Sequence, residues 1–131
     1  ESRELNVMLR EKGVDSIYLL APTSTSNRMK EVAKMARGYV YYVSLKGVTG
    51  ATHLDVQSVA ERIPEIKAEI KLPIGVGFGI KDSSTAAAVS AIADAVVIGS
   101  RIVEEIESSA VDELEDNIFK LLSNIRQAID T

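Results

Sequence analysis

Glycines that directly follow two apolar segments are the residues of this sequence best suited to chemistry. Gly79 lies at the end of one such segment, and Gly99 and Ser100 lie at the end of the next and open a short helical pattern. Backbone N–H groups exposed at glycines and in the first turn of a helix bind anions without a lysine or an arginine. The spacing therefore predicts a phosphate site, although the same glycines could simply permit tight turns.

The composition disfavours most other kinds of site. The chain has 131 residues, no cysteine and one histidine, His53, so we expect no disulfide, no thiol nucleophile and no metal site. The nucleotide pattern G-x-G-x-x-G is absent. Residues 51–131 hold seven basic and fourteen acidic side chains, which makes nucleic acid a poor partner. With no signal peptide and no membrane-spanning segment in the pattern, we expect a cytoplasmic protein.

Apolar and amphipathic segments alternate along the chain and must position these glycines. Residues 1–12 have the spacing of the end of a helix, and residues 13–131 read as four strand–helix units. Strands are expected at 14–20, 39–44, 73–80 and 95–98. Helices are expected near 28–37, 54–70, 83–93 and 112–129, with a short one from 101, and Pro64 is expected either to break the helical ladder or to start a second helical piece.

The expected strands are apolar almost throughout, which indicates burial on both faces and therefore parallel α/β structure. In such folds ligands bind where the strands end. A closed (β/α)₈ barrel needs about 250 residues, so this chain has room for about half of one. Four units fit either half of a TIM barrel or a small open sheet.

Four blocks of sequence resemble the alpha subunit of tryptophan synthase. In chain order they are LLAPT at 19–23, GYVYYVS at 38–44 with GVTGA at 47–51, PIGVGFGI at 73–80, and VVIGSRIV at 96–103. The tyrosine-rich block joined to GVTGA and the block ending in GFGI are the most distinctive. The resemblance covers essentially the whole chain. It implies that residues 1–131 are one partial domain, the C-terminal half of a (β/α)₈ TIM barrel with strands five to eight.

The resemblance implies a lyase of tryptophan biosynthesis. In this family, indole-3-glycerol phosphate is cleaved by a retro-aldol reaction to indole and glyceraldehyde 3-phosphate. The alpha subunit needs no cofactor, because pyridoxal phosphate belongs to the partner beta subunit of an alpha2beta2 assembly. The acid–base pair, a glutamate and an aspartate, comes from the early strands. We therefore expect no catalytic residue in this chain, no activity from it alone, and a missing N-terminal half-barrel as a second partner.

The resemblance also implies which residues contact the substrate. Backbone amides are expected to hold the phosphate at Gly50, Gly79, Gly99 and Ser100. An apolar slot for the indole ring is expected from Leu19, Tyr41, Phe78 and Ile98. Thr49 is expected on a loop that folds over the substrate and helps to position the catalytic aspartate. Tyr39 and Tyr42 are expected to pack in the core, and neither His53 nor Arg101 has an assigned role.

Two other functions fit the same residues. The first is a different phosphate-binding barrel, such as indole-glycerol-phosphate synthase or an isomerase of histidine synthesis, although the tyrosine-rich strand followed by GVTG argues against it. The second is an isolated half-barrel that acts only as a folding or assembly module, without activity. Four parallel strands leave two open edges and one uncovered face. We expect these to be covered by a second copy of the chain, by the missing half-barrel or by the rest of a longer chain.

Overall fold

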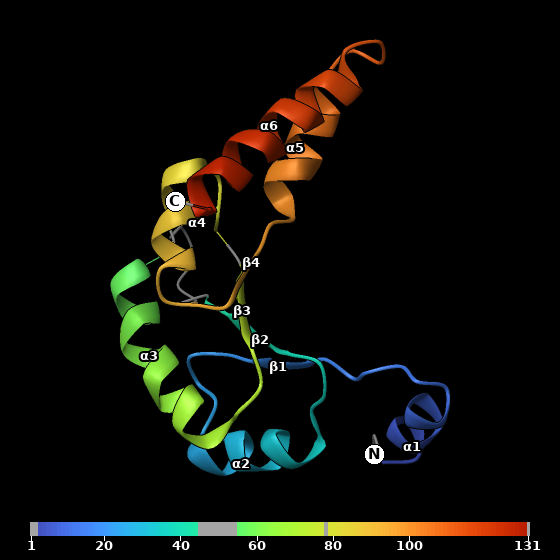
Figure 1. Cartoon of the computed structure of the whole chain (residues 1–131), viewed down its shortest axis with the longest axis vertical. Coiled ribbons are helices and arrows are strands. Elements are labelled where there is room, and N and C mark those ends of the chain that lie inside the picture. The colour runs from blue at the N-terminus through green and yellow to red at the C-terminus, as the bar shows by residue number, and fades with distance from the viewer. Residues whose placement is uncertain (1–2, 45–54, 78, 131) are drawn as a thin grey trace.

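The computed structural model describes residues 3–44, 55–77 and 79–130, in which helices and short strands alternate (Figure 1). The elements are α1 (Arg3–Glu11), β1 (Tyr18–Leu20), α2 (Ser26–Met35), β2 (Val40–Val43), α3 (Val56–Glu69), β3 (Ile74–Gly77), α4 (Ser83–Ser90), β4 (Ala95–Val97), α5 (Ser100–Ser108) and α6 (Leu114–Ile129). The strands form one parallel sheet in the order β1-β2-β3-β4. The predicted element order and parallel sheet are confirmed.

Helices α2, α3 and α4 lie on one side of this sheet (Figure 1). Figure 1 shows α2, α3 and α4 along one side, α1 set apart near the β1 end, and the α5–α6 pair beyond β4. Helix α6 packs against both α4 and α5. Within the described ranges, no helix combines the length and the apolar composition needed to cross a membrane.

The two faces of the sheet differ in burial. Side chains that share a register row point to the same face, and they alternate along each strand. The helix-covered face is buried and carries Leu20, Val40, Tyr42, Ile74 and Val76. The other face, which we name the open face, carries Leu19, Tyr41, Val43, Gly75, Gly77, Ala95 and Val97. Leu19 on the open face is 58% exposed, so part of this apolar face is not covered by the described residues.

The first strand is shorter than the sequence predicts, because the residues before it end α1. Gly13 adopts a left-handed φ of 69° and donates its N–H to the Arg10 carbonyl at 3.0 Å. Val14 donates to the Leu9 carbonyl at 2.9 Å, which completes a Schellman motif. The Val14 amide is thus used by the helix, and β1 begins only at Tyr18.

Pro64 lies inside a continuous α3 and does not break it. A proline removes one N–H from the helix ladder. Here the buried residues on both sides of it, Val59, Ile63 and Ile66, form one stripe that packs against the sheet. Burial of that stripe holds the two halves of the helix in line.

Asp94 fixes the amino-terminal edge of the sheet, on the side away from the predicted phosphate site. Its carboxylate accepts the Ile74 N–H at 2.9 Å and an ammonium hydrogen of Lys67 at 3.3 Å. Its own N–H donates to the Ile74 carbonyl at 3.0 Å. These bonds, first of all the one from Ile74, lower the pKa of the Asp94 carboxyl below its ordinary value.

We expect Asp94→Asn to lower the free energy of unfolding by about 1 kcal/mol at pH 7, a modest value because solvent screens the 42% exposed side chain. A carboxyl whose pKa is lowered by folding stabilises the protein above its unfolded pKa, near 3.9, and this contribution is lost as the pH falls through the folded pKa. Urea unfolding should therefore show a difference at pH 7 that vanishes near pH 2. Asp112→Asn, on an exposed loop, is the matched control, and a difference that persists at pH 2 would contradict this account.

Candidate functional site

The carboxyl ends of all four strands meet at one edge of the sheet. Because the strands are parallel, the residues that follow β3 and β4 lie at this same edge. Gly79 there has a φ of 81°, a left-handed conformation that a glycine adopts without strain. Gly99 and Ser100 lie at the same edge, where Ser100 is the first residue of α5. The structure thus brings three predicted phosphate-binding residues to one edge.

The first turn of α5 is open, unlike those of the other helices that follow a strand. Side chains of Thr25, Asp55 and Asp82 accept N–H groups at the starts of α2, α3 and α4. Gly99 precedes α5 and provides no such side chain. A Cβ atom built at Gly99 would have nothing within 4 Å. The positive end of the α5 dipole is therefore uncapped and approachable by an anion.

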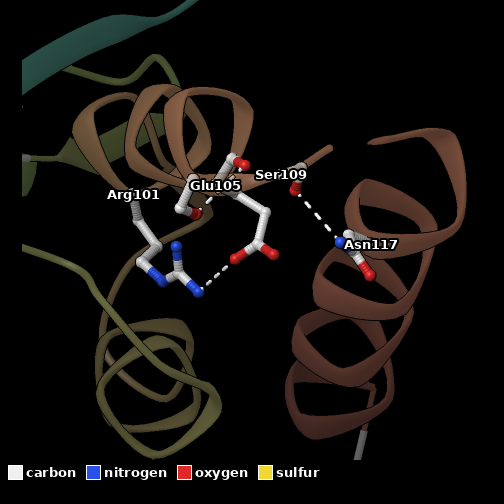
Figure 2. Close-up of polar contacts among 5 residues, drawn as sticks. Arg101, Glu105, Ser109 and Asn117 are labelled. Carbon is white, nitrogen blue, oxygen red and sulfur yellow. Dashed lines mark hydrogen bonds and ion pairs between the residues drawn. The ribbon is translucent and has the colours of Figure 1, made fainter. Parts of the chain in front are cut away.

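Arg101 points along α5 and does not take part in this opening. Its guanidinium forms an ion pair with the Glu105 carboxylate one turn later (Figure 2). Beyond that pair, Asn117 of α6 donates to the Ser109 hydroxyl at 3.1 Å and ties the end of α5 to α6. An anion at Gly99 and Ser100 would depend on backbone N–H groups.

Two of the predicted ring-binding residues share the open face. Leu19 and Tyr41 are register partners on β1 and β2. The Tyr41 ring reaches over β3, because a Cβ built at Gly77 would lie 2.2 Å from the Tyr41 hydroxyl oxygen and 2.8 Å from two ring carbons. Burial, and next the neighbouring Tyr39, raise the pKa of the Tyr41 hydroxyl. Tyr41 is thus a neutral phenol at neutral pH and offers a flat apolar surface.

Ile98 lies on the other side of the sheet. Together with Val96 it lines an apolar pocket of about 600 Å³ against α6, with Phe119, Leu122 and Ile125 among the other lining residues. β4 places Ala95 and Val97 on the open face, and Val97, nearer its carboxyl end, has its Cγ2 3.6 Å from a Cβ built at Gly75. Sequence reasoning missed Val97, which the strict alternation along β4 could have indicated.

The two other tyrosines near β2, Tyr39 just before it and Tyr42 within it, differ in burial. Tyr42 is 2% exposed and packs in the core, in accordance with the sequence-based expectation. Tyr39 does not pack in the core: it is 37% exposed, and its ring lies against Gly75 on the open face. Of the other predicted contacts, Thr49, Gly50 and Phe78 lie outside the described residues, as does His53.

Acid–base groups do not gather at this site in the part of the chain that the structure describes. The open face of the four strands offers only phenols and apolar side chains. Asp82, the carboxylate at the start of α4, accepts the Thr85 N–H at 2.7 Å, and this bond lowers its pKa. Among the described residues, no group of three histidine, aspartate or glutamate side chains is arranged to hold a metal ion. Over the residues described, the arrangement offers backbone N–H groups suited to an anion and an apolar face suited to an aromatic ring, and no acid–base group on that face.

Comparison with known sequences identifies relatives over nearly the whole chain. The family model described as tryptophan synthase alpha chain matches residues 1–130. The tryptophan synthase alpha chain of Chromobacterium violaceum is 50% identical over 129 residues, which are 98% of this chain and 49% of the relative. That of Paraburkholderia phymatum is 53% identical over 131 residues, 100% of this chain and 48% of the relative. The chain spans about half the length of the curated relatives it matches.

Comparison with solved structures gives the same result for the fold. Tryptophan synthase subunit alpha from Legionella pneumophila superposes with a TM-score of 0.84 at 36% identity, over 99% of this chain and 48% of that one. A tryptophan synthase structure from M. tuberculosis superposes with a TM-score of 0.82 at 26% identity, over 98% and 46% of the two chains. The predicted fold, four parallel strand–helix units that match half of a TIM barrel, is confirmed.

Proposed function

Because this chain belongs to the tryptophan synthase alpha chain family, we propose that it forms the phosphate- and ring-binding half of a lyase barrel. The proposed reaction is the retro-aldol cleavage of indole-3-glycerol phosphate to indole and glyceraldehyde 3-phosphate. The single observation that supports this most strongly is the placement of the uncapped first turn of α5 at the edge of the face that carries Tyr41. A phosphate and an aromatic ring of one substrate can therefore be held side by side.

The proposed phosphate ligands are the backbone amides of Gly79, Gly99 and Ser100, together with Gly50. A site made of backbone N–H groups and a helix dipole binds a phosphate without a buried lysine or arginine. Such a site allows the cleaved product to be released. For the ring we propose Leu19, Tyr41 and Phe78, with Val97 as an addition from the structure. Ile98 is adjacent in sequence but faces α6, so Val97 is the better placed of the two.

The proposed reaction needs proton transfers that these residues do not supply. Cleavage of the bond between the ring and the glycerol chain requires a base for a hydroxyl proton and an acid that protonates the ring carbon. The Tyr41 phenol, with its raised pKa, is a poor base at neutral pH. We therefore assign the acid–base pair to the N-terminal half-barrel, with Thr49 proposed to help position its aspartate. Closure of the complete barrel would exclude water from the site.

We further propose the assembly that the family implies. The N-terminal half-barrel covers the open face, and a beta subunit that carries pyridoxal phosphate takes up the indole. In this proposal the chain itself needs no cofactor and no metal, and it acts in the cytoplasm. The alternative of an inactive folding or assembly module shares the same fold, and only a measurement of function separates the two. A different phosphate-binding barrel is disfavoured by the family match over residues 1–130.

Binding of inorganic phosphate tests the proposed anion site on the chain itself. We expect a phosphate titration to shift the backbone amide NMR signals of Gly99, Ser100 and Arg101. Gly99→Asp should weaken this binding at least about tenfold, because its carboxylate repels the phosphate. A tenfold change corresponds to about 1.4 kcal/mol of binding free energy. Ala110→Asp adds the same charge at the other end of α5 and should leave the binding unchanged.

The start of α6 provides an internal comparison for the phosphate titration. It also lacks a side-chain cap, but Glu115 and Asp116 lie in its first turn and should repel an anion. We therefore expect no shift of the amides there. Equal shifts at the starts of α5 and α6, or none at α5, would contradict the proposed phosphate site.

A further inference from the structure

We propose that Tyr39 is the floor of the ring-binding slot and limits the size of the aromatic group that the slot accepts. This inference rests on the proposed function, because it concerns the same slot. Tyr39 precedes β2 and has the same parity as Tyr41, so both side chains point to the open face. Tyr39 lies two residues nearer the amino-terminal end, about 7 Å below Tyr41 along the strand.

The Tyr39 ring closes the open face at this lower level. A Cβ built at Gly75 would lie 3.3 Å from Cε2 and 3.4 Å from Cδ2 of Tyr39, and 3.6 Å from Cγ2 of Val97. The ring of Tyr39, from the residue before β2, and a methyl group of Val97, from β4, therefore both border the space over Gly75, where β3 contributes no side chain. One level higher, the Tyr41 ring covers Gly77 in the same way. Two tyrosines thus replace the side chains that β3 lacks.

The direction of the substrate makes Tyr39 the end of the slot. The proposed phosphate site is at the carboxyl-terminal edge, at Gly99 and Ser100. A ligand held there by its phosphate extends its ring along the open face toward the amino-terminal ends of the strands. The ring first passes Tyr41 and then meets Tyr39. A substituent on the benzo side of an indole, the side away from the phosphate, would therefore point at Tyr39.

The four tyrosines of the chain allow a direct test, because two lie on each face of the sheet. Tyr39 and Tyr41 are on the open face, and Tyr18 and Tyr42 have the parity of the helix-covered face. The chain has no tryptophan, so added indole is the only indole present. We expect an indole titration of the chain to shift the ring signals of Tyr39 and Tyr41 in NMR spectra. The signals of Tyr18 and Tyr42 should stay unchanged.

Substitution then tests the size limit. With Tyr39→Leu, we expect the affinity for an indole with one methyl group on its benzo ring, relative to indole, to rise at least about tenfold. Tyr39→Phe should keep the original ratio, since the ring and not its hydroxyl forms the floor. Tyr18→Leu, the same change on the other face, should also keep it. Gly75→Ala adds a methyl group 3.3 Å from the Tyr39 ring and should weaken the binding of indole itself. This variant serves as a second test should Tyr39→Leu fail to fold.

The outcomes separate this inference from the proposed function. Indole that shifts Tyr41 and not Tyr39, or a ratio that is the same in Tyr39→Leu and Tyr18→Leu, would overturn the role of Tyr39. Phosphate binding at Ser100 without any indole shift would also overturn it, while the phosphate half of the proposed function would stand. Indole shifts at Tyr39 without phosphate binding at Ser100 would support the floor and count against the proposed phosphate site.

Discussion

Replacing Gly77 with alanine is expected to lower the free energy of unfolding by about 2–3 kcal/mol and to abolish ring binding on the open face. The added methyl group would lie 2.2 Å from the Tyr41 hydroxyl oxygen and 2.8 Å from two ring carbons, far inside van der Waals contact. An over-close contact of this kind costs about 1–3 kcal/mol, and here it is relieved only by moving the whole Tyr41 ring, because two ring carbons as well as the hydroxyl oxygen lie within 2.8 Å of the new methyl group. The Tyr41 ring would have to leave the face that it forms.

A second substitution should relieve this collision. Tyr41→Leu removes the distal ring atoms that the new methyl group meets, so Gly77→Ala should cost less than about 1 kcal/mol in that background. Urea unfolding of the four proteins in this double-mutant cycle gives the coupling energy directly. Gly99→Ala is the control, since a methyl group there has nothing within 4 Å. An equal cost of Gly77→Ala with and without the Tyr41 ring would contradict the packing described.

The order and direction of the strands could be predicted from the sequence because they follow from local patterns. Apolar runs separated by amphipathic runs require crossovers, and crossovers of that length give parallel neighbours. The boundary of β1 could not be predicted in the same way. Val14 is β-branched and suits a strand, but its N–H completes the end of α1 through the Leu9 carbonyl. The Val14 side chain gives no sign of this backbone bond, so a pattern of apolar side chains alone extends the strand back to Val14.

The placement of the proposed phosphate-binding glycines was predicted more fully than that of the proposed ring-binding residues. A glycine after a strand indicates an opening by itself, and Gly79 and Gly99 were found for that reason. The slot depends on which face each strand residue takes and on what lies across the neighbouring strand. Ile98 and Val97 are equally apolar, and only the parity of β4 separates them. Tyr39 acquires its place from the missing side chain of Gly75, which is 36 positions later in the sequence.

The second large effect concerns catalysis. We expect this chain alone to release indole from indole-3-glycerol phosphate no faster than the uncatalysed background, and the chain combined with an N-terminal half-barrel to release it at least about 10³-fold faster than that background. General acid–base groups each contribute about 10²–10⁴-fold, and the open face described here carries none. The N-terminal half is best taken from the part of the Chromobacterium violaceum relative that this chain does not match, since the matched part is 50% identical.

Two controls make the complementation specific to the proposed site. Gly99→Asp in the assembled protein should raise the KM for indole-3-glycerol phosphate by tenfold or more, because the added charge opposes the substrate phosphate. Ala110→Asp should leave it unchanged. The N-terminal half alone should be inactive, because it lacks the phosphate edge. These controls also exclude an assembly in which this chain only helps the other half to fold.

The release of indole from indole-3-glycerol phosphate, measured for this chain alone and after mixing with the N-terminal half-barrel, tests the central claim most directly. The account predicts no release by either half and steady release by the mixture. Turnover by this chain alone would show that it holds acid–base groups which we assign to the other half. A mixture that assembles into one stable complex and releases no indole would contradict the proposed function itself.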